Sequence, residues 1–202
     1  MVEFAFPKPF RYNVGQIRRD IVSLTAQTVS KHLTDYEQIK QLYHDSFPVK
    51  EQVKWSWLMW KAKSKHAKFL AYYDDNQLVG FSYVIHHHHL DFLFFLAVNP
   101  NLHSQGYGGQ ILDWLNAKRP EVPIVLDAEP LNDQATNAKQ RRRRMAFYHN
   151  HGFYDSRHRV TEDSLTYAIL TNQDFELAQL VAAYRWFFRP FNHRHQLKFD
   201  QL

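Results

Sequence analysis

A glycine-rich turn between an apolar run and a helical pattern is the segment of this sequence best suited to bind an anion. The apolar run covers Leu90 to Val98, and glycines follow at positions 106, 108 and 109, just before Ile111. The first N–H groups of a helix have no partners within it, and the helix dipole adds positive potential at that end. Because glycines carry no side chain, the turn predicts a phosphate or pyrophosphate site.

The spacing of these glycines excludes two common nucleotide motifs. A Walker loop needs Gly-Lys-Ser or Gly-Lys-Thr, which is absent. A Rossmann fingerprint reads Gly-x-Gly-x-x-Gly in the first strand–helix unit, with an acidic residue about 20 positions later. Here the turn lies in the middle of the chain and reads Gly106-Tyr107-Gly108-Gly109. A plain helix start in a tight turn is the alternative, and the glycines alone do not decide between the two.

An aromatic segment at the end of a basic helical pattern gives a second clue. Residues 147–153 read Phe-Tyr-His-Asn-His-Gly-Phe, and residues 103–108 read His-Ser-Gln-Gly-Tyr-Gly. The two segments resemble motifs of the GNAT superfamily of N-acetyltransferases, Phe-Tyr-x-x-x-Gly-Phe and Arg/Gln-x-x-Gly-x-Gly/Ala. Their order and the length between them also resemble the family, and the resemblance covers residues 22–170.

The resemblance implies that acetyl-coenzyme A (acetyl-CoA) binds as a co-substrate. In the family, the pantetheine arm pairs with a splayed strand, which corresponds to Leu96, Ala97 and Val98, and an amide there polarises the thioester carbonyl. The family's arginine or glutamine is replaced by His103, which is mostly neutral at pH 7, so phosphate contact there is expected to be weaker or pH-dependent. The pyrophosphate lies on the turn, which corresponds to His103, Ser104, Gln105, Gly106, Tyr107, Gly108 and Gly109.

The resemblance also implies two catalytic groups. Tyr148 matches the family tyrosine that protonates the departing thiolate, because a phenol keeps its proton at neutral pH. The alternative is a tyrosine packed against the sheet. Family members often use a strand glutamate as the base, and Glu129 is the candidate here, with Asp127 behind it. Its alternative role is an ion pair with the arginines of the next helix, and proximity of amine and thioester contributes to the rate in either case.

The elements that must position these residues alternate in a mixed order. We expect strands over 22–30, 69–73, 78–85, 90–98, 123–128, 153–156 and 164–170, and helices over 34–47, 51–64, 105–115, 137–151 and 174–188. This order predicts an α/β (α+β) fold, and the resemblance makes it a GNAT-type mixed, mostly antiparallel central sheet flanked by helices, with a C-terminal helical extension.

The domain boundaries follow from the same pattern. Residues 1–21 are expected to form an N-terminal arm and residues 22–171 an acetyltransferase domain. Residues 172–202 are expected to form the extension, packed on the domain or at a homodimer interface.

Composition restricts the chemistry and the environment. The chain has 202 residues, which suits one domain, and no cysteine, which excludes disulfides, a thiol nucleophile and cysteine-bound zinc. No basic and apolar leader begins the sequence, and no apolar run approaches the ~20 residues of a membrane span. We therefore expect a cytoplasmic protein with no membrane partner. The formal charge of +5 favours anionic ligands.

Two runs of like residues suggest other functions less strongly. The arginines at 141–144 point around most of a helix, toward the adenosine phosphate of coenzyme A, Glu129 or water, and no nucleic-acid motif accompanies them. We therefore expect no nucleic-acid partner. The histidines at 86–89 alternate between the faces of a strand, so at most two share a face. They predict a polar hairpin tip and no metal site.

The sequence therefore predicts an N-acetyltransferase. It would move an acetyl group from acetyl-CoA to a primary amine of a small molecule or peptide, by direct attack in a ternary complex. Because the run 90–98 contains no glutamate, a non-catalytic acyl-CoA-binding module on the same fold is the alternative.

Overall fold

The computed structural model describes residues 24–87, 89–162, 165–189 and 197–201, whose strands form one sheet in the order β1-β2-β3-β4-β5-β7-β6-β8. Only β4 and β5 run parallel. The predicted mixed, mostly antiparallel sheet is therefore confirmed. The strands are β1 (Thr25–Thr28), β2 (Ala67–Asp74), β3 (Gln77–His87), β4 (Leu90–Val98), β5 (Ile124–Ala128), β6 (Tyr154–Glu162), β7 (Leu165–Thr171) and β8 (Leu197–Gln201).

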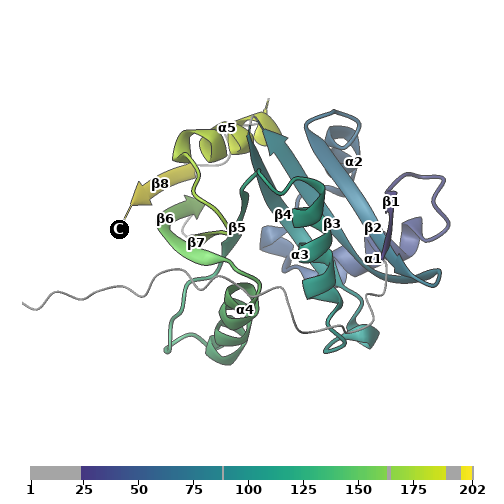
Figure 1. Ribbon diagram of the computed structural model, residues 1–202, viewed down its shortest axis with the longest axis horizontal. Coiled ribbons are helices and arrows are strands. Elements are labelled where there is room, and N and C mark those ends of the chain that lie inside the picture. Colours follow the sequence, from purple (N-terminus) through teal and green to yellow (C-terminus); the bar gives the residue numbers. More distant parts are fainter. Residues whose placement is uncertain (1–23, 88, 163–164, 190–196, 202) are drawn as a thin grey trace, which may run out of the picture.

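Helices cover both faces of this sheet (Figure 1). The main core lies on one face, where β3 and β4 meet α1, α2 and α5, and a second cluster lies under α3 and α4 on the other face. Adjacent residues such as Phe92 and Leu93 belong to opposite clusters because strand side chains alternate. The helices are α1 (Tyr36–Ser46), α2 (Trp55–Lys61), α3 (Tyr107–Lys118), α4 (Ala138–Asn150) and α5 (Leu177–Phe188), with short 3-10 turns η1 (Val49–Glu51) and η2 (Pro100–Leu102).

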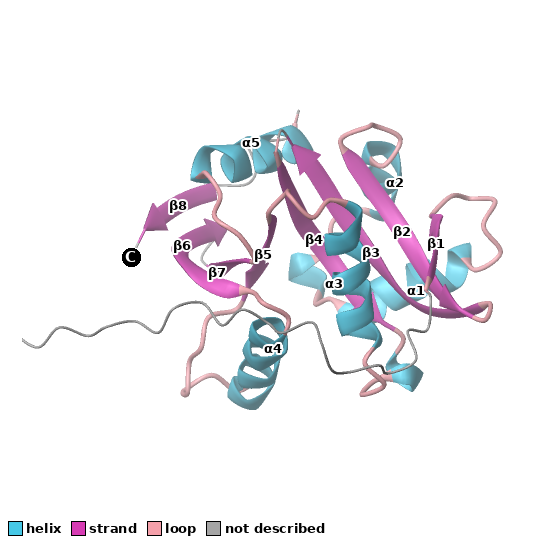
Figure 2. Cartoon of the chain, viewed as in Figure 1, coloured by secondary structure: helices cyan, strands magenta, loops and turns pink. Residues whose placement is uncertain are grey.

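The strands β4 and β5 separate soon after they meet. Their pairing includes Phe92↔Val125 and one pair before it. A register shift in the β3–β4 pairing leaves Phe94 as an extra residue on β4, and such a bulge bends the strand. We call the opening between residues 94–98 of β4 and 126–128 of β5 the fork. In Figure 2, the strands from β5 onward diverge from the β1–β4 group beyond this point.

The C-terminal extension contains a strand as well as the predicted helix. Leu180, Ala183 and Phe187 of α5 are fully buried in the main core. The strand β8 was not predicted; it pairs with β6, and Val160 faces Phe199. Its alternation places Phe199 against the core between two exposed charged residues, a pattern too short to detect by periodicity.

Two further observations complete the comparison with the predicted elements. The predicted arm over 1–21 lies outside the described residues, as does the start of the predicted strand over 22–30. Among the helices that the structure describes, none is both long enough and apolar enough to span a membrane.

Candidate active site

The turn between β4 and α3 presents free backbone amides. Ser104 and Gly106 have φ of 65° and 87°, and Gly106 caps α3 without any side-chain hydrogen bond. In the part of the chain that the structure describes, the N–H groups of residues 104–109 donate to no protein acceptor. These amides lie at the positive end of the helix dipole, so the turn has the properties of an anion site.

The glycines of the turn meet different requirements. A Cβ added to Gly106 would have nothing within 4 Å, so this glycine serves the left-handed backbone and leaves the surface open. A Cβ on Gly108 would lie 3.1 Å from Phe147 Cζ, and one on Gly109 would overlap the His151 ring. The last two glycines therefore allow α3 to approach the end of α4, a reason that the sequence did not reveal.

Two side chains of the turn hold it in place. His103 Nε2 lies 3.1 Å from the backbone oxygen of Val98, so the imidazole contacts the last residue of β4. The Tyr107 hydroxyl donates to Asp74 Oδ2 at 2.6 Å and ties the turn to the β2–β3 hairpin. The predicted contact of His103 with phosphate stays a prediction; its Nε2 is engaged by the chain itself.

Leu96, Ala97 and Val98 lie on β4 where the fork is open. They pair with β3 on one side, and a Cβ on Gly80 of β3 would overlap the carbonyl oxygen of Ala97. On the other side, no described strand pairs with them. The free edge can therefore accept an extended ligand as an additional strand.

Tyr148 reaches toward the fork from α4. Its ring packs 5.2 Å from Phe147 and 5.9 Å from Phe153, between centroids. Burial raises the pKa of the phenol to about 12; the Arg144 charge opposes this and Asp127 adds to it. Within the described residues, the hydroxyl has no hydrogen-bond partner in the protein. The phenol therefore keeps its proton at neutral pH and is free to donate it.

Glu129 is held by side chains of the next helix and its N-cap. Its carboxylate accepts hydrogen bonds from Arg141 at 2.9 Å, Asn137 at 3.0 Å and Arg144 at 3.3 Å. These ion pairs are the alternative role that the sequence left open. A carboxylate with three donors holds the start of α4 beside β5, and these hydrogen bonds favour its ionised form over the protonated one.

On the other face of β5, Asp127 and Tyr184 form a pair that connects the central sheet to the C-terminal extension. The Tyr184 hydroxyl donates to Asp127 Oδ2 at 2.5 Å. Burial raises the pKa of Asp127 to about 6; the Tyr184 bond lowers it, and Glu162 and Glu51 raise it. The sequence did carry one signal for Asp127, because a carboxylate inside an apolar strand is typical of functional sites. Nothing in the sequence indicated its partner on α5.

A second pair lies beside the first. The Tyr167 hydroxyl of β7 hydrogen-bonds the Glu51 carboxylate of η1, and burial followed by the Glu129 charge raises the pKa of Glu51. Burial and the surrounding carboxylates also raise the pKa of Tyr167. Protonatable groups from η1, β5, β7 and α5 thus meet at one side of β5.

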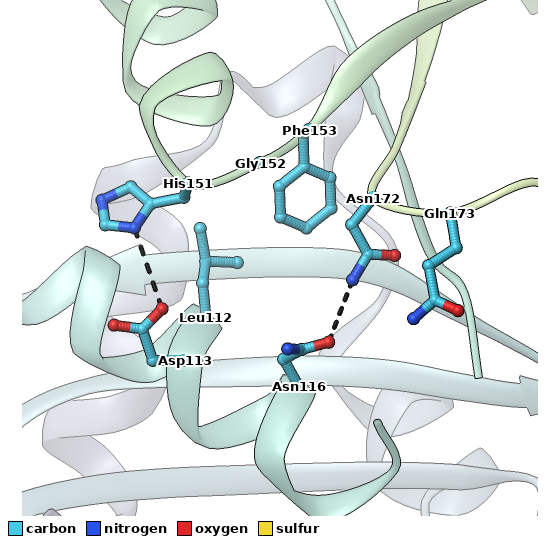
Figure 3. A pocket seen from close by; sticks show the side chains of 8 residues that line it. All are labelled: Leu112, Asp113, Asn116, His151, Gly152, Phe153, Asn172 and Gln173. Atoms are coloured by element: carbon cyan, nitrogen blue, oxygen red, sulfur yellow. Dashed lines mark hydrogen bonds and ion pairs between the residues drawn. The ribbon is translucent and has the colours of Figure 1, made fainter. Parts of the chain in front are cut away.

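A polar cavity of about 220 Å³ lies where α3, the end of α4 and β7 meet (Figure 3). Asn172 donates to Asn116 across it at 3.1 Å, and His151 Nδ1 lies 3.9 Å from Asp113. It is smaller than the roughly 300–1,000 Å³ of common ligand sites and contains none of the predicted cofactor-binding residues. Its polar contacts connect α3 to the end of α4 and to the segment that follows β7.

The two runs of like residues have mainly local partners. Arg141 and Arg144 bind Glu129, and Arg142 binds Asp133 at 2.6 Å. The β3–β4 hairpin lies at the predicted histidine run, where His86 is 2.7 Å from Asp91. Across the ranges that the structure describes, no group of three or more histidine, aspartate or glutamate side chains could hold a metal ion.

The fork beside a glycine turn and the sheet order are those of the GNAT acetyltransferase fold. Residues 65–155 match the family model described as an acetyltransferase (GNAT) domain. The resemblance predicted from the two sequence motifs is confirmed, because the matched residues include both motifs.

Solved structures with the same fold match this chain over nearly their whole length. An acetyltransferase of the GNAT family from Bacteroides thetaiotaomicron is 21% identical with a TM-score of 0.64, and the match covers 83% of this chain and 97% of that one. Ard1 from Thermoplasma volcanium is 17% identical with a TM-score of 0.56, covering 77% and 100%. An aminoglycoside 6'-N-acetyltransferase complexed with coenzyme A is 16% identical with a TM-score of 0.56, covering 75% and 99%. No curated protein sequence matches the chain significantly.

Proposed function

We propose that this protein transfers the acetyl group of acetyl-CoA to a primary amine of a small molecule or peptide, by direct attack in a ternary complex. The observation that carries the proposal is the fork between β4 and β5, which opens beside the free amides of residues 104–109. The fork suits an extended thioester arm, and the free amides suit a pyrophosphate. The reaction as proposed involves no metal ion, nucleic acid or membrane and takes place in the cytoplasm.

The proposed cofactor position uses both features. The pyrophosphate lies on the amides of the glycine turn, and the pantetheine arm lies along the free edge of Leu96, Ala97 and Val98. The thioester then reaches the bulge at Phe94, where a backbone N–H that the bulge frees from strand pairing polarises its carbonyl. The similar aminoglycoside 6'-N-acetyltransferase structure, which contains coenzyme A, supports this class of ligand.

Tyr148 is the proposed acid. Its phenol is protonated at neutral pH and has no protein acceptor among the described residues, so it can give its proton to the departing thiolate. Glu129 was predicted as the base, and that role stays a prediction. Its three donors support an anchoring role instead, because a base must be free to contact the amine.

Calorimetry and a thiol-release screen test the proposal. The protein is titrated with coenzyme A and acetyl-CoA, then mixed with acetyl-CoA and a panel of benzylamine, putrescine and a lysine-containing peptide. We expect binding of both cofactor forms and amine-dependent release of free thiol. Binding without release would favour the alternative, a non-catalytic acyl-CoA-binding module. The absence of binding would contradict both.

A further inference from the structure

The position of Asp127 relative to the fork distinguishes it from the other carboxylates. The last parallel pair is Phe92↔Val125, so Asp127 is the second residue of β5 beyond the point where the strands separate. Side chains alternate along β5, and Leu126 and Ala128 belong to the cluster under α3 and α4. Asp127 therefore points to the opposite face, away from the glycine turn.

Tyr184 packs against β4 beside the fork, on the face to which Asp127 points. Its ring lies 4.6 Å from that of Phe92, the last β4 residue paired with β5, and it is only 2% exposed. Its hydroxyl donates to Asp127 Oδ2 at 2.5 Å, and Asp127 as a residue is intermediate in burial. One carboxylate oxygen is thus fixed by a buried hydroxyl.

We infer that Asp127 is the base that accepts the amine proton, and that Tyr184 is a positioning residue that holds the Asp127 carboxylate beside the fork. The inference rests on the proposed acetyl transfer. Among the described residues, it assigns proton acceptance to the strand carboxylate with one side-chain hydrogen-bond donor, and it leaves Glu129, which has three, as an anchor for α4.

The two proton transfers then use the two sides of the fork. The neutral amine nitrogen forms a bond to the carbonyl carbon, the carbon–sulfur bond breaks, and the amine proton passes to Asp127. The sulfur takes the phenolic proton of Tyr148, which lies on the α4 side but close enough to feel the Asp127 charge. The proton on Asp127 returns to the phenolate through solvent, so that the products are an amide and a free thiol.

The environment of Asp127 suits a base at neutral pH. Burial, Glu162 and Glu51 raise its proton affinity, and the Tyr184 bond limits the rise, giving a pKa of about 6. The carboxylate is therefore ionised above about pH 6 and becomes inactive as the pH falls below it. The titratable groups that face it are Tyr184 of α5, Glu162 of β6, Glu51 of η1, Tyr148 of α4 and Tyr167 of β7.

The test compares kcat from about pH 5 to 9 with acetyl-CoA and the panel amine that reacts fastest. Asp127→Asn is expected to lower kcat by at least about 100-fold. It should also remove the fall in kcat at low pH, which we call the acid limb, with unchanged calorimetric affinity for acetyl-CoA. Tyr184→Phe is expected to lower kcat less and to move the acid limb to higher pH, because the lost hydrogen bond favoured the ionised carboxylate. Asp155→Asn, which changes a strand carboxylate that binds Arg159, is the matched control and should leave kcat unchanged.

Each outcome has a distinct meaning. If the wild type transfers acetyl groups and Asp127→Asn keeps its rate and acid limb, the inference is wrong and the proposed function stands. The same holds if Glu129→Gln, and not Asp127→Asn, removes the limb. A Tyr184→Phe variant that loses rate without any shift of the limb would reduce Tyr184 to a packing residue. A wild type that binds acetyl-CoA but acetylates no amine would overturn both proposals together.

Discussion

The two sides of the fork are built from different groups. On the α3 side, the candidate anion site consists of backbone amides from one continuous segment, residues 104–109. On the α5 side, Asp127, Tyr184, Glu51 and Tyr167 come from four separate elements, and all four are side chains. The candidate anion site depends on backbone conformation, and the other side depends on how distant elements pack.

The two sides should therefore be sensitive to different substitutions. A backbone site tolerates most side-chain changes and fails where a glycine is required. A side-chain site fails at single functional groups, whatever the backbone does. The first should therefore respond in cofactor affinity and the second in turnover and pH dependence.

The largest effect is expected at Tyr148. Tyr148→Phe removes the proposed acid without changing the shape of the ring, so kcat should fall by about 100- to 1,000-fold. Calorimetric affinity for acetyl-CoA should remain the same. Tyr154→Phe, which loses only an exposed hydrogen bond to Asp174, should retain full activity. Equal rates for the two variants would show that the thiolate leaves without help from Tyr148.

A smaller effect, on affinity, is expected at the glycine turn. Gly106→Val places a side chain on the open amide surface and strains a backbone with φ of 87°, so the affinity for coenzyme A should fall by about 10- to 100-fold. Gly152→Val is the matched control, because Gly152 has φ of 84° and the same empty surroundings at the end of α4. Both should lose similar stability, and only Gly106→Val should lose affinity. A similar loss in both would argue against the pyrophosphate position.

A pH-dependent gain in stability is expected at Asp127. Its pKa rises from 3.8 to about 6 on folding, so its ionisation costs stability as the pH rises through that range. Asp127→Asn should therefore stabilise the protein above about pH 7 by about 1–2 kcal/mol, less than the full shift implies because Asp127 as a residue is only intermediate in burial. Thermal unfolding at about pH 4 and pH 8 checks this, with a gain of several degrees only at the higher pH. An equal gain at both values would mean that charge is not the cause.

The smallest effect is expected at His103. Its ring is bound to the carbonyl of Val98, so His103→Ala should change the affinity for coenzyme A by less than about threefold, with the same result across about pH 5.5–8. Calorimetric measurement of the affinity for coenzyme A at the two ends of this pH range checks the prediction. A large loss confined to low pH would restore the phosphate contact that the sequence predicted.

Most elements near the site could be predicted from the sequence, and the exceptions have physical reasons. The strand Leu90–Val98 was predicted with its correct limits because a continuous apolar run has a clear end at Asn99-Pro100. The helix expected over 51–64 is instead η1 followed by the short α2, because tertiary packing overrides local helical spacing. This break leaves Glu51 in η1, where its carboxylate meets the Tyr167 hydroxyl.

The proposed cofactor side of this protein could be predicted from local sequence. The glycines, the preceding apolar strand and the Phe-Tyr-x-x-x-Gly-Phe segment lie within short stretches, so their chemistry can be read from neighbouring residues. Only the tertiary structure decided the other side, because Asp127 and Tyr184 are separated by 57 positions and meet through the packing of α5 on the sheet. It also decided that Glu129 is bound by arginines, since that depends on how α4 returns beside β5.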